Sequence, residues 1–519
     1  MFNSPAASGP AFNSPAPGGP SILLTTINAK WIHPSLALRL LKANLGSLEA
    51  DCEILEFALR QPLAEKVQAI QSRRPRVLGI SVSIWNHSAT LELLGALDNE
   101  WRTAGTCEIE PGGDTALPVR SRPAVVLGGP EVSYLPEEAE IFRRADYVIR
   151  GEGEESFRRL CGALAGGENP GGRGPGFPRF INGTPAELAG IRQAYHYYSD
   201  EDLSRKLVYV EASRGCPFRC DFCQSAAAGL REFPLEPFLA EMDALIRRGA
   251  RNFKFLDRSF NADIKRALGI MDFFLRRIEG GSGGPETGPL ADRSLCVHFE
   301  MVPGLFPPEL REKLRRFPPG ALRLEIGIQT LNPRVSARIN RPGEGEAALE
   351  LLRFLGGETN ATVHADLIAA LPGEGIDSFG EGFDRLWLAL SGPAESAATP
   401  AAPGPGNAPA GPVTRDRRFE IQLGILKLLP GTPMARHTEP YGMIFSPAPP
   451  YEALSTAALP GPELDRIKNF ARFWEILVNR RPFPELPIAP AGEKVFWRFM
   501  ELSGRLLARF GRNWGIDRG

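Results

Sequence analysis

Three cysteines that lie within eight residues, Cys216, Cys220 and Cys223, could bind a metal through their thiolates. An iron–sulfur cubane takes one thiolate for each of its four irons. Because no fourth cysteine is near them in the sequence, this C-x3-C-x2-C spacing predicts a 4Fe-4S cluster with one iron open to another ligand. The alternative is a structural zinc ion, whose fourth ligand would have to be Cys296 or a distant histidine.

The remaining cysteines do not extend this group. An odd total of seven, in a long chain without a recognisable secretory signal, argues against a disulfide framework and for metal or redox chemistry. Scattered single cysteines are mostly small buried hydrophobes, which is what we expect of Cys52, Cys107, Cys161 and Cys296.

Composition and charge exclude several classes of protein. The 60 basic and 61 acidic side chains give a net charge of −1, so no overall field attracts nucleic acid. No apolar stretch approaches the roughly 18 residues that a membrane helix needs, and no signal peptide is recognisable. We therefore expect a cytoplasmic protein that has neither a membrane nor a nucleic acid as its partner.

The 519 residues are long enough for two or three cores, because a single core stops growing at roughly 250–300 residues. Segments rich in Pro, Gly and Ala recur along the chain and predict exposed insertions, most clearly at 393–413. The predicted organisation is a disordered tail at 1–20, a first domain at 21–165, a linker at 166–201, a second domain at 202–433, and a helical C-terminal region at 434–519.

Between the tail and residue 165, short apolar runs alternate with amphipathic stretches. Such alternation predicts an α/β domain with a doubly wound, flavodoxin-like parallel sheet, whose ligands bind at the carboxyl ends of the strands. The predicted strands are 21–27, 52–57, 77–84, 124–127 and 147–149, and the predicted helices are 35–45, 63–72, 87–97 and 136–142.

A second alternating series follows, and six strand–helix units fit a partial (β/α)6 barrel better than another open sheet. The three cysteines come directly after its first strand, so they would lie at the mouth of the barrel. In the C-terminal region, apolar residues of 463–478 fall at helical spacing and predict one buried helix face. The predicted barrel strands are 207–211, 253–256, 296–300, 323–328, 361–368 and 420–426.

The cysteine loop, with Phe222 before the last thiol, resembles the signature of the radical S-adenosylmethionine superfamily. Segment 366–374, D-L-I-A-A-L-P-G-E, resembles the exit of the fifth strand in that family, although Ala370 replaces a glycine. The resemblance implies that S-adenosylmethionine binds the open iron and is reduced to a 5′-deoxyadenosyl radical, which abstracts hydrogen from a substrate. Glu300 and Gln329 lie at strand ends where family members contact the methionine or ribose.

The strand-end loops of the first domain resemble a cobalamin-binding domain found upstream of many radical S-adenosylmethionine enzymes. Small residues at these ends would let a large flat ligand approach the backbone. Trp31, Trp85 and Asn86 are candidates for packing on the corrin. No D-x-H-x-x-G motif is present, and Pro34 after His33 favours a turn role over cobalt ligation. The candidate cofactor-binding residues of this domain are His33, Ser81, Ser83, Gly128 and Gly129.

The resemblance as a whole is to proteins with a cobalamin domain, a radical core and a helical extension of unassigned function. It implies methylation or rearrangement at an unactivated carbon of a small-molecule or natural-product-like substrate, with an electron donor such as flavodoxin or ferredoxin. One alternative is a methylthiotransferase-like enzyme that modifies RNA and holds a second cluster on Cys52, Cys107 and Cys161. These three, however, lie in a predicted strand, an insertion and a helix. Another alternative is a non-catalytic protein that binds or senses cobalamin and has a structural metal site.

Overall fold

The computed structural model describes residues 21–104, 122–165, 177–226, 228–280, 294–341, 345–391, 419–480 and 494–515. The chain divides into two compact units, the first made of Met1–Val210 with Glu236–Ala250 and the second of Glu211–Leu235 with Arg251–Gly519. The predicted tail, most of the predicted insertions and Cys107 lie outside the described residues. None of the described helices is long and apolar enough to cross a membrane.

The first unit contains a six-stranded parallel sheet in the order β2-β1-β3-β4-β5-β6. Sequence order reverses at β1, which has β2 on one side and β3 on the other, and such a reversal is the switch point of a doubly wound sheet. The prediction of this fold class is confirmed. The strands are β1 (Ile22–Asn28), β2 (Cys52–Ala58), β3 (Val77–Ser81), β4 (Ala124–Gly128), β5 (Tyr147–Arg150) and β6 (Phe180–Asn182).

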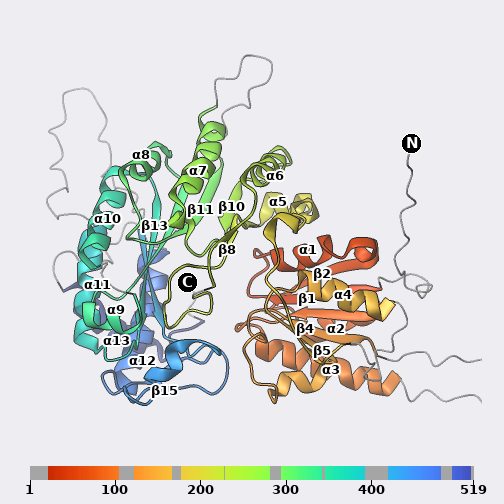
Figure 1. Cartoon of the computed structure of the whole chain (residues 1–519). Helices are drawn as coiled ribbons and strands as arrows, with labels where there is room; N and C mark the ends of the chain where they lie inside the picture. Colours follow the sequence, from red (N-terminus) through yellow and green to blue (C-terminus); the bar gives the residue numbers. More distant parts are fainter. Residues whose placement is uncertain are drawn as a thin grey trace, which may run out of the picture. The chain divides into compact units, whose positions relative to one another are not determined.

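Helices cover both faces of this sheet (Figure 1). Alternate residues of each strand point to opposite faces, so β1 contributes Leu23 and Ile27 to one apolar core and Ile22 and Leu24 to the other. The first core is closed by α2 (Leu63–Gln71) and α3 (His87–Ala104), and the second by α1 (Leu36–Ala43) and α4 (Glu154–Ala165).

Two predictions for this unit were wrong. The predicted linker at 166–201 contains β6, which extends the sheet, and it runs into the short helix α5 (Asp200–Arg205). β6 has only three residues, Phe-Ile-Asn, and its two apolar residues are too short a run to identify a strand from the sequence. The helix predicted at 136–142 is instead a short 3-10 helix at Glu140–Arg144.

The second sheet also has six strands, in the order β14-β13-β12-β11-β10-β7. Neighbours from β10 to β14 pair in parallel, and they follow sequence order without a reversal. Because crossover connections are right-handed, such an order puts all helices on one face and leaves the other as the interior of a partial barrel, as predicted. The strands are β7 (Val208–Val210), β10 (Asn252–Phe255), β11 (Cys296–Met301), β12 (Leu322–Gln329), β13 (Thr362–Ala369) and β14 (Phe419–Ile425).

The two faces of this second sheet differ in chemistry. Every second residue of β11, β12 and β13 is buried and apolar, such as Phe299, Leu324 and Val363. The residues between them are mostly polar and only partly buried, so the open face carries charge. The helices that follow the strands are α6 (Leu235–Arg247), α7 (Ile264–Glu279), α8 (Pro308–Arg316), α9 (Pro333–Arg338), α10 (Gly345–Glu358) and α11 (Ile376–Ser391).

The C-terminal region is not wholly helical, contrary to the prediction for 434–519. It begins with a 3-10 helix at Pro433–His437 and an antiparallel pair, β15 (Ile444–Phe445) and β16 (Ala453–Ser455), before α12 (Gly461–Trp474) and α13 (Val495–Phe510). The buried face predicted for 463–478 forms, but a π turn at Glu475–Asn479 shifts its end, so that Val478 rather than Leu477 is buried.

Candidate functional site

The loop that carries the three cysteines is closed at its base by two short antiparallel strands, β8 (Ser213–Arg214) and β9 (Arg231–Glu232). Gly215 has a φ of +88°, and a Cβ there would lie 1.8 Å from the carbonyl oxygen of Gly229. Only glycine allows the two ends of the loop to approach so closely. Cys220 is buried, Cys216 and Cys223 are half-buried, and none of the three is in a disulfide.

Two side chains from elsewhere in the second unit donate hydrogen bonds to these sulfurs. The Ser259 hydroxyl lies 3.8 Å from Sγ of Cys216, and a guanidinium nitrogen of Arg341 lies 3.5 Å from Sγ of Cys220. Burial raises the pKa of the Cys220 thiol, while the Arg341 charge opposes that rise. Both donors favour the thiolate, which is the form that binds metal. Since Ser259 follows β10, the loop lies at the carboxyl end of that strand.

The described residues fit a cluster better than a zinc ion. Tetrahedral zinc needs four ligands on one ion, whereas a cubane distributes its thiolates over separate irons. Cys296 is the first residue of β11, at the opposite end of the sheet from the loop, so it cannot be the fourth ligand.

A row of charged side chains crosses the open face of the second sheet. Strand register aligns Glu300, Glu325, His364 and Glu420 on neighbouring strands. Glu325 accepts from Lys254 at 3.1 Å and lies 3.4 Å from Nε2 of His298; His364 lies 3.5 Å from Glu420. Burial opposes the ionisation of Glu325, but its His298 and Lys254 partners prevail and lower its pKa to about 2.

The pKa values of two other carboxyl groups on this face are raised. Burial, and then the nearby Glu325 and Glu300, raise the pKa of Asp366 well above its ordinary value. Burial likewise raises the pKa of Glu300, although Arg258 lies 3.7 Å away. A carboxyl whose pKa is raised in this way holds its proton more tightly than an exposed carboxyl does. Glu300 was predicted to contact cofactor, and the structure places it in this polar row.

Gln329, the other predicted cofactor contact in this unit, ends β12 at a bulge with a φ of +68°. Its amide folds back over Gly327, where a Cβ would lie 2.4 Å from Nε2. Arg341 donates to the Gly327 carbonyl at 2.5 Å, so it joins this strand end to the cysteine loop. Sequence reasoning missed Arg341, because it is 121 residues from Cys220 and belongs to none of the motifs.

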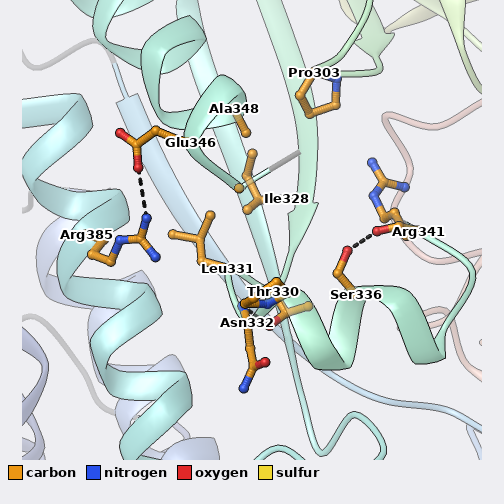
Figure 2. Close-up of a pocket in the computed structure, with 12 residues that line it drawn as sticks. Pro303, Ile328, Thr330, Leu331, Asn332, Ser336, Arg341, Glu346, Ala348 and Arg385 are labelled. Carbon is orange, nitrogen blue, oxygen red and sulfur yellow. Dashed lines mark hydrogen bonds and ion pairs between the residues drawn. The ribbon is translucent and has the colours of Figure 1, made fainter. Parts of the chain in front are cut away.

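A cavity of about 270 Å³ lies beside the end of β12 (Figure 2). Arg341 lines one side of it, and the Glu346–Arg385 ion pair, at 3.0 Å, lines another. Thr330, also in its wall, donates at 2.6 Å to the buried Glu374, whose pKa burial raises to about 7. The residues that line the cavity are Pro303, Ile328, Thr330, Leu331, Asn332, Pro333, Ser336, Arg341, Gly345, Glu346, Ala348 and Arg385.

The carboxyl edge of the first sheet carries exposed apolar side chains, whereas the open face of the second sheet carries charged ones. Of the ten large hydrophobic side chains that are exposed among the described residues, five lie within six residues after the ends of strands β1 to β4. Exposed apolar groups gathered in this way mark a ligand or partner site. They suit a large flat ligand, and Trp31 and Trp85, predicted for this role, are 50% and 54% exposed. The five are Trp31, Ile32, Leu59, Trp85 and Tyr134.

Asn86, which was predicted to face the same ligand, is instead fully buried. Its carbonyl accepts from the Ser83 backbone at 2.8 Å, and its amide donates to the Ile27 carbonyl at 3.0 Å. It therefore holds the turn after β3, because both backbone groups need partners away from water. Ser83 is buried in the same turn, and the Ser81 carbonyl accepts from Thr26 at 2.9 Å.

The predicted glycine pair and His33 each have partners within the first unit. Gly129 has a φ of +104°, and a Cβ would lie 2.6 Å from the Val82 carbonyl, so strand packing alone requires glycine there. Gly128 would tolerate a Cβ, with its nearest neighbour at 3.7 Å. Nδ1 of His33 is 2.8 Å from the Tyr209 hydroxyl, which orients the ring in the loop after β1.

Comparison with known proteins agrees with the two sheets. The family model of the B12 binding domain matches residues 22–161, and that of the Radical SAM superfamily matches residues 210–386. An uncharacterized methyltransferase of Pyrococcus horikoshii is 30% identical over 168 residues, which cover 28% of this chain and 36% of the relative. A ribosomal protein uS12 methylthiotransferase, RimO of Synechocystis, is 23% identical over 36% of this chain and 43% of its own. The chain thus spans less than half the length of these relatives.

Two solved structures share the fold at low sequence identity. The cobalamin-dependent S-adenosylmethionine radical enzyme OxsB, with aqua-cobalamin and S-adenosylmethionine bound, has a TM-score of 0.61 at 14% identity, covering 96% of this chain and 74% of its own. The radical S-adenosylmethionine methyltransferase TsrM of Kitasatospora setae, with tryptophan substrate and a cofactor analogue bound, has a TM-score of 0.54 at 18% identity, covering 80% and 74%. At these identities the likeness concerns the fold alone.

Proposed function

We propose that this chain methylates an unactivated carbon of a small-molecule substrate, using a 4Fe-4S cluster, S-adenosylmethionine and cobalamin. The matches of residues 22–161 to the B12 binding domain and of residues 210–386 to the Radical SAM superfamily support this proposal. The observation that carries the proposal is the group of three free thiols on one loop, two of which accept hydrogen bonds from Ser259 and Arg341. Methylation is favoured over rearrangement because two curated relatives are named methyltransferases.

The proposed roles follow from position and chemistry. Cys216, Cys220 and Cys223 would hold the cluster, and Trp31 and Trp85 would pack on the corrin. Together these cofactors would supply an electron for cleaving S-adenosylmethionine and a methyl group for transfer. Candidate cofactor contacts remain His33, Ser81, Ser83, Gly128 and Gly129 in the first unit and Glu300 and Gln329 in the second.

The polar face of the second sheet would manage protons and exclude competing reactions. Burial raises the pKa values of Asp366 and Glu300, which makes these two carboxyl groups the candidates for holding a proton near the substrate. Glu325, paired with Lys254, would stay ionised and keep a fixed charge in the barrel. An electron donor such as flavodoxin or ferredoxin would supply the reducing equivalent.

A methylthiotransferase activity is the second candidate, because several curated relatives carry that name. It would require three further cysteine ligands in the first unit. Cys52 and Cys161 are buried in the same apolar core, and burial raises both pKa values, that of Cys52 to about 12. Thiols that resist ionisation and face an apolar core are poor ligands, which argues against a second cluster there.

The test is anaerobic reconstitution of the full chain with iron, sulfide and hydroxocobalamin. We expect about four irons and one cobalamin per chain, and 5′-deoxyadenosine and methionine on reduction with S-adenosylmethionine. Methylation would also release S-adenosylhomocysteine, since a second S-adenosylmethionine must supply the methyl group. Iron without cobalt would refute the cobalamin half of the proposal. Cobalamin binding without 5′-deoxyadenosine would indicate a sensor.

A further inference from the structure

The carboxylate of Asp221 lies inside the cysteine loop, directly after Cys220, and is only 1% exposed. One of its oxygens accepts from the Asn340 amide at 2.7 Å. The other accepts from Nη2 of Arg436 at 2.5 Å and from Nε2 of His437 at 2.7 Å. A buried carboxylate is tolerated only when its oxygens are so paired, and here every donor comes from outside the loop.

The first set of donors comes from the segment that follows α9. The Asp221 backbone N–H donates to the Ile339 carbonyl at 3.0 Å, and the Asn340 side chain reaches the carboxylate. Arg341 then donates to Cys220 Sγ at 3.5 Å. Three consecutive residues therefore contact two consecutive loop residues. These contacts fix the Asp221 backbone and the Cys220 sulfur relative to the same segment.

The second set comes from the segment that follows β14. Arg436 and His437 end the 3-10 helix at Pro433–His437, and the His437 ring is itself buried. Nearer the strand, the Pro430 carbonyl accepts from the amide of Gln224, the residue after Cys223. The loop is thus anchored on either side of Cys223 by one segment more than 200 residues away.

We infer that Asp221 is a positioning residue, which fixes the directions of the Cys220 and Cys223 sulfurs by locking the loop to these two segments. The inference rests on the proposed cluster. Apart from the β8–β9 pair at its base, the loop has no regular structure, so its sulfur positions depend on such anchors. Charge-assisted hydrogen bonds are strong and directional, and partners of this kind commonly govern metal affinity. The start of the C-terminal region, at Arg436 and His437, would then be part of the cluster site.

Asp221→Asn tests the inference, because it keeps the shape but turns an acceptor into an NH2 donor facing Arg436 and His437. Asp202→Asn is the matched control: Asp202 is also buried and accepts from Arg39 at 2.9 Å and Lys206 at 2.8 Å, in the other unit. Each full-length variant is reconstituted anaerobically. Iron release to a chelator, the electron paramagnetic resonance spectrum of the reduced protein with and without S-adenosylmethionine, and the unfolding midpoint before reconstitution are then measured.

We expect Asp221→Asn to release iron at least about tenfold faster and to lose the spectral response to S-adenosylmethionine. Asp202→Asn should lower the unfolding midpoint but keep the wild-type spectrum and release rate. If Asp221→Asn does not fold, Arg436→Gln, at a more exposed position, should show the same change to a smaller degree. Wild-type release and spectra in the Asp221 variant, or in Arg436→Gln where that replaces it, would overturn the positioning role and leave the proposed function intact. Wild-type protein that takes up no cluster would overturn both.

Discussion

The two sheets each have six strands with connecting helices, but they present opposite chemistry to a ligand. In the first sheet the strand order reverses at β1, helices cover both faces, and the free surface is a carboxyl edge bearing Trp31 and Trp85. In the second sheet the order never reverses, and one face stays open and carries charges. The connection order alone decides whether a parallel sheet offers an edge or a face. A flat, largely apolar cofactor suits the first, and a charged one suits the second.

The largest expected effect comes from removing a thiol of the second unit. Cys220→Ala should lower the rate of S-adenosylmethionine cleavage by more than about 1,000-fold, since the cubane would lose a ligand. Cobalamin affinity should change by less than about twofold, because its apolar edge is in the other unit. Release of 5′-deoxyadenosine measures the cleavage rate, and a cobalamin titration measures the affinity. Cys296→Ala, at a buried thiol away from the loop, is the control, and loss of both functions in Cys220→Ala would contradict separable sites.

The reciprocal experiment changes the exposed aromatic side chains at the carboxyl edge of the first sheet. Trp31→Ala combined with Trp85→Ala should weaken cobalamin binding by about 100-fold, because two aromatic side chains no longer cover the macrocycle. The unfolding free energy should shift by less than about 0.5 kcal/mol, since both side chains are half exposed. Equilibrium titration with hydroxocobalamin gives the affinity. Trp514→Ala, 66% exposed in the C-terminal region, should leave it unchanged; an equal loss there would mean nonspecific binding.

Both folds and the cysteine loop were predictable because their signals are local. Strand alternation repeats within each unit, and the three thiols lie within eight residues. The partners of the cysteine loop were not predictable, because they are far from it in the sequence and reach it only in the folded second sheet. These partners are Ser259, Arg341 and Arg436. Asn86 shows the opposite error: a polar residue at a strand end was assigned to a ligand, but its amide satisfies backbone groups.

A buried carboxyl at the carboxyl edge of the second sheet sharpens the comparison through pH. Burial raises the pKa of Glu374 from an ordinary 4.5 to about 7, so the unfolded chain releases this proton at lower pH than the folded one. The folded state therefore loses stability as pH rises from about 4.5 to 7. Glu374→Gln removes this pH-dependent loss of stability, while the side-chain carbonyl of Gln can still accept a hydrogen bond from Thr330.

We expect the Gln variant to be more stable than wild type by about 3 kcal/mol at pH 8 and nearly equal to it at pH 4. Urea unfolding of the full chain at both pH values measures this. Glu350→Gln, on an exposed position of α10, is the control and should show no pH-dependent difference. A stabilisation of Glu374→Gln that is the same at both pH values would mean that packing, not the proton, is responsible.

The smallest effect concerns backbone conformation at the two carboxyl edges. In the first sheet the left-handed positions after β4 and β5 are glycines, Gly129 and Gly151, whereas Ala370 after β13 has a φ of +67°. That conformation costs an L-residue about 1–2 kcal/mol, but glycine loses about 0.5–1 kcal/mol more entropy on folding, and the buried methyl is worth about 0.8 kcal/mol. The terms nearly cancel, which explains why alanine is tolerated where the family pattern has glycine.

Ala370→Gly should therefore change the unfolding free energy by less than about 1 kcal/mol. Ala369→Gly is the matched control, since Ala369 is equally buried but lies in the strand and gains no relief of strain. It should lose about 1–2 kcal/mol, and the difference between the variants isolates the left-handed backbone. Urea midpoints measured at one pH are sufficient. Equal losses in both would mean that the conformation costs alanine nothing, and the two edges would then differ in ligand chemistry but not in backbone strain.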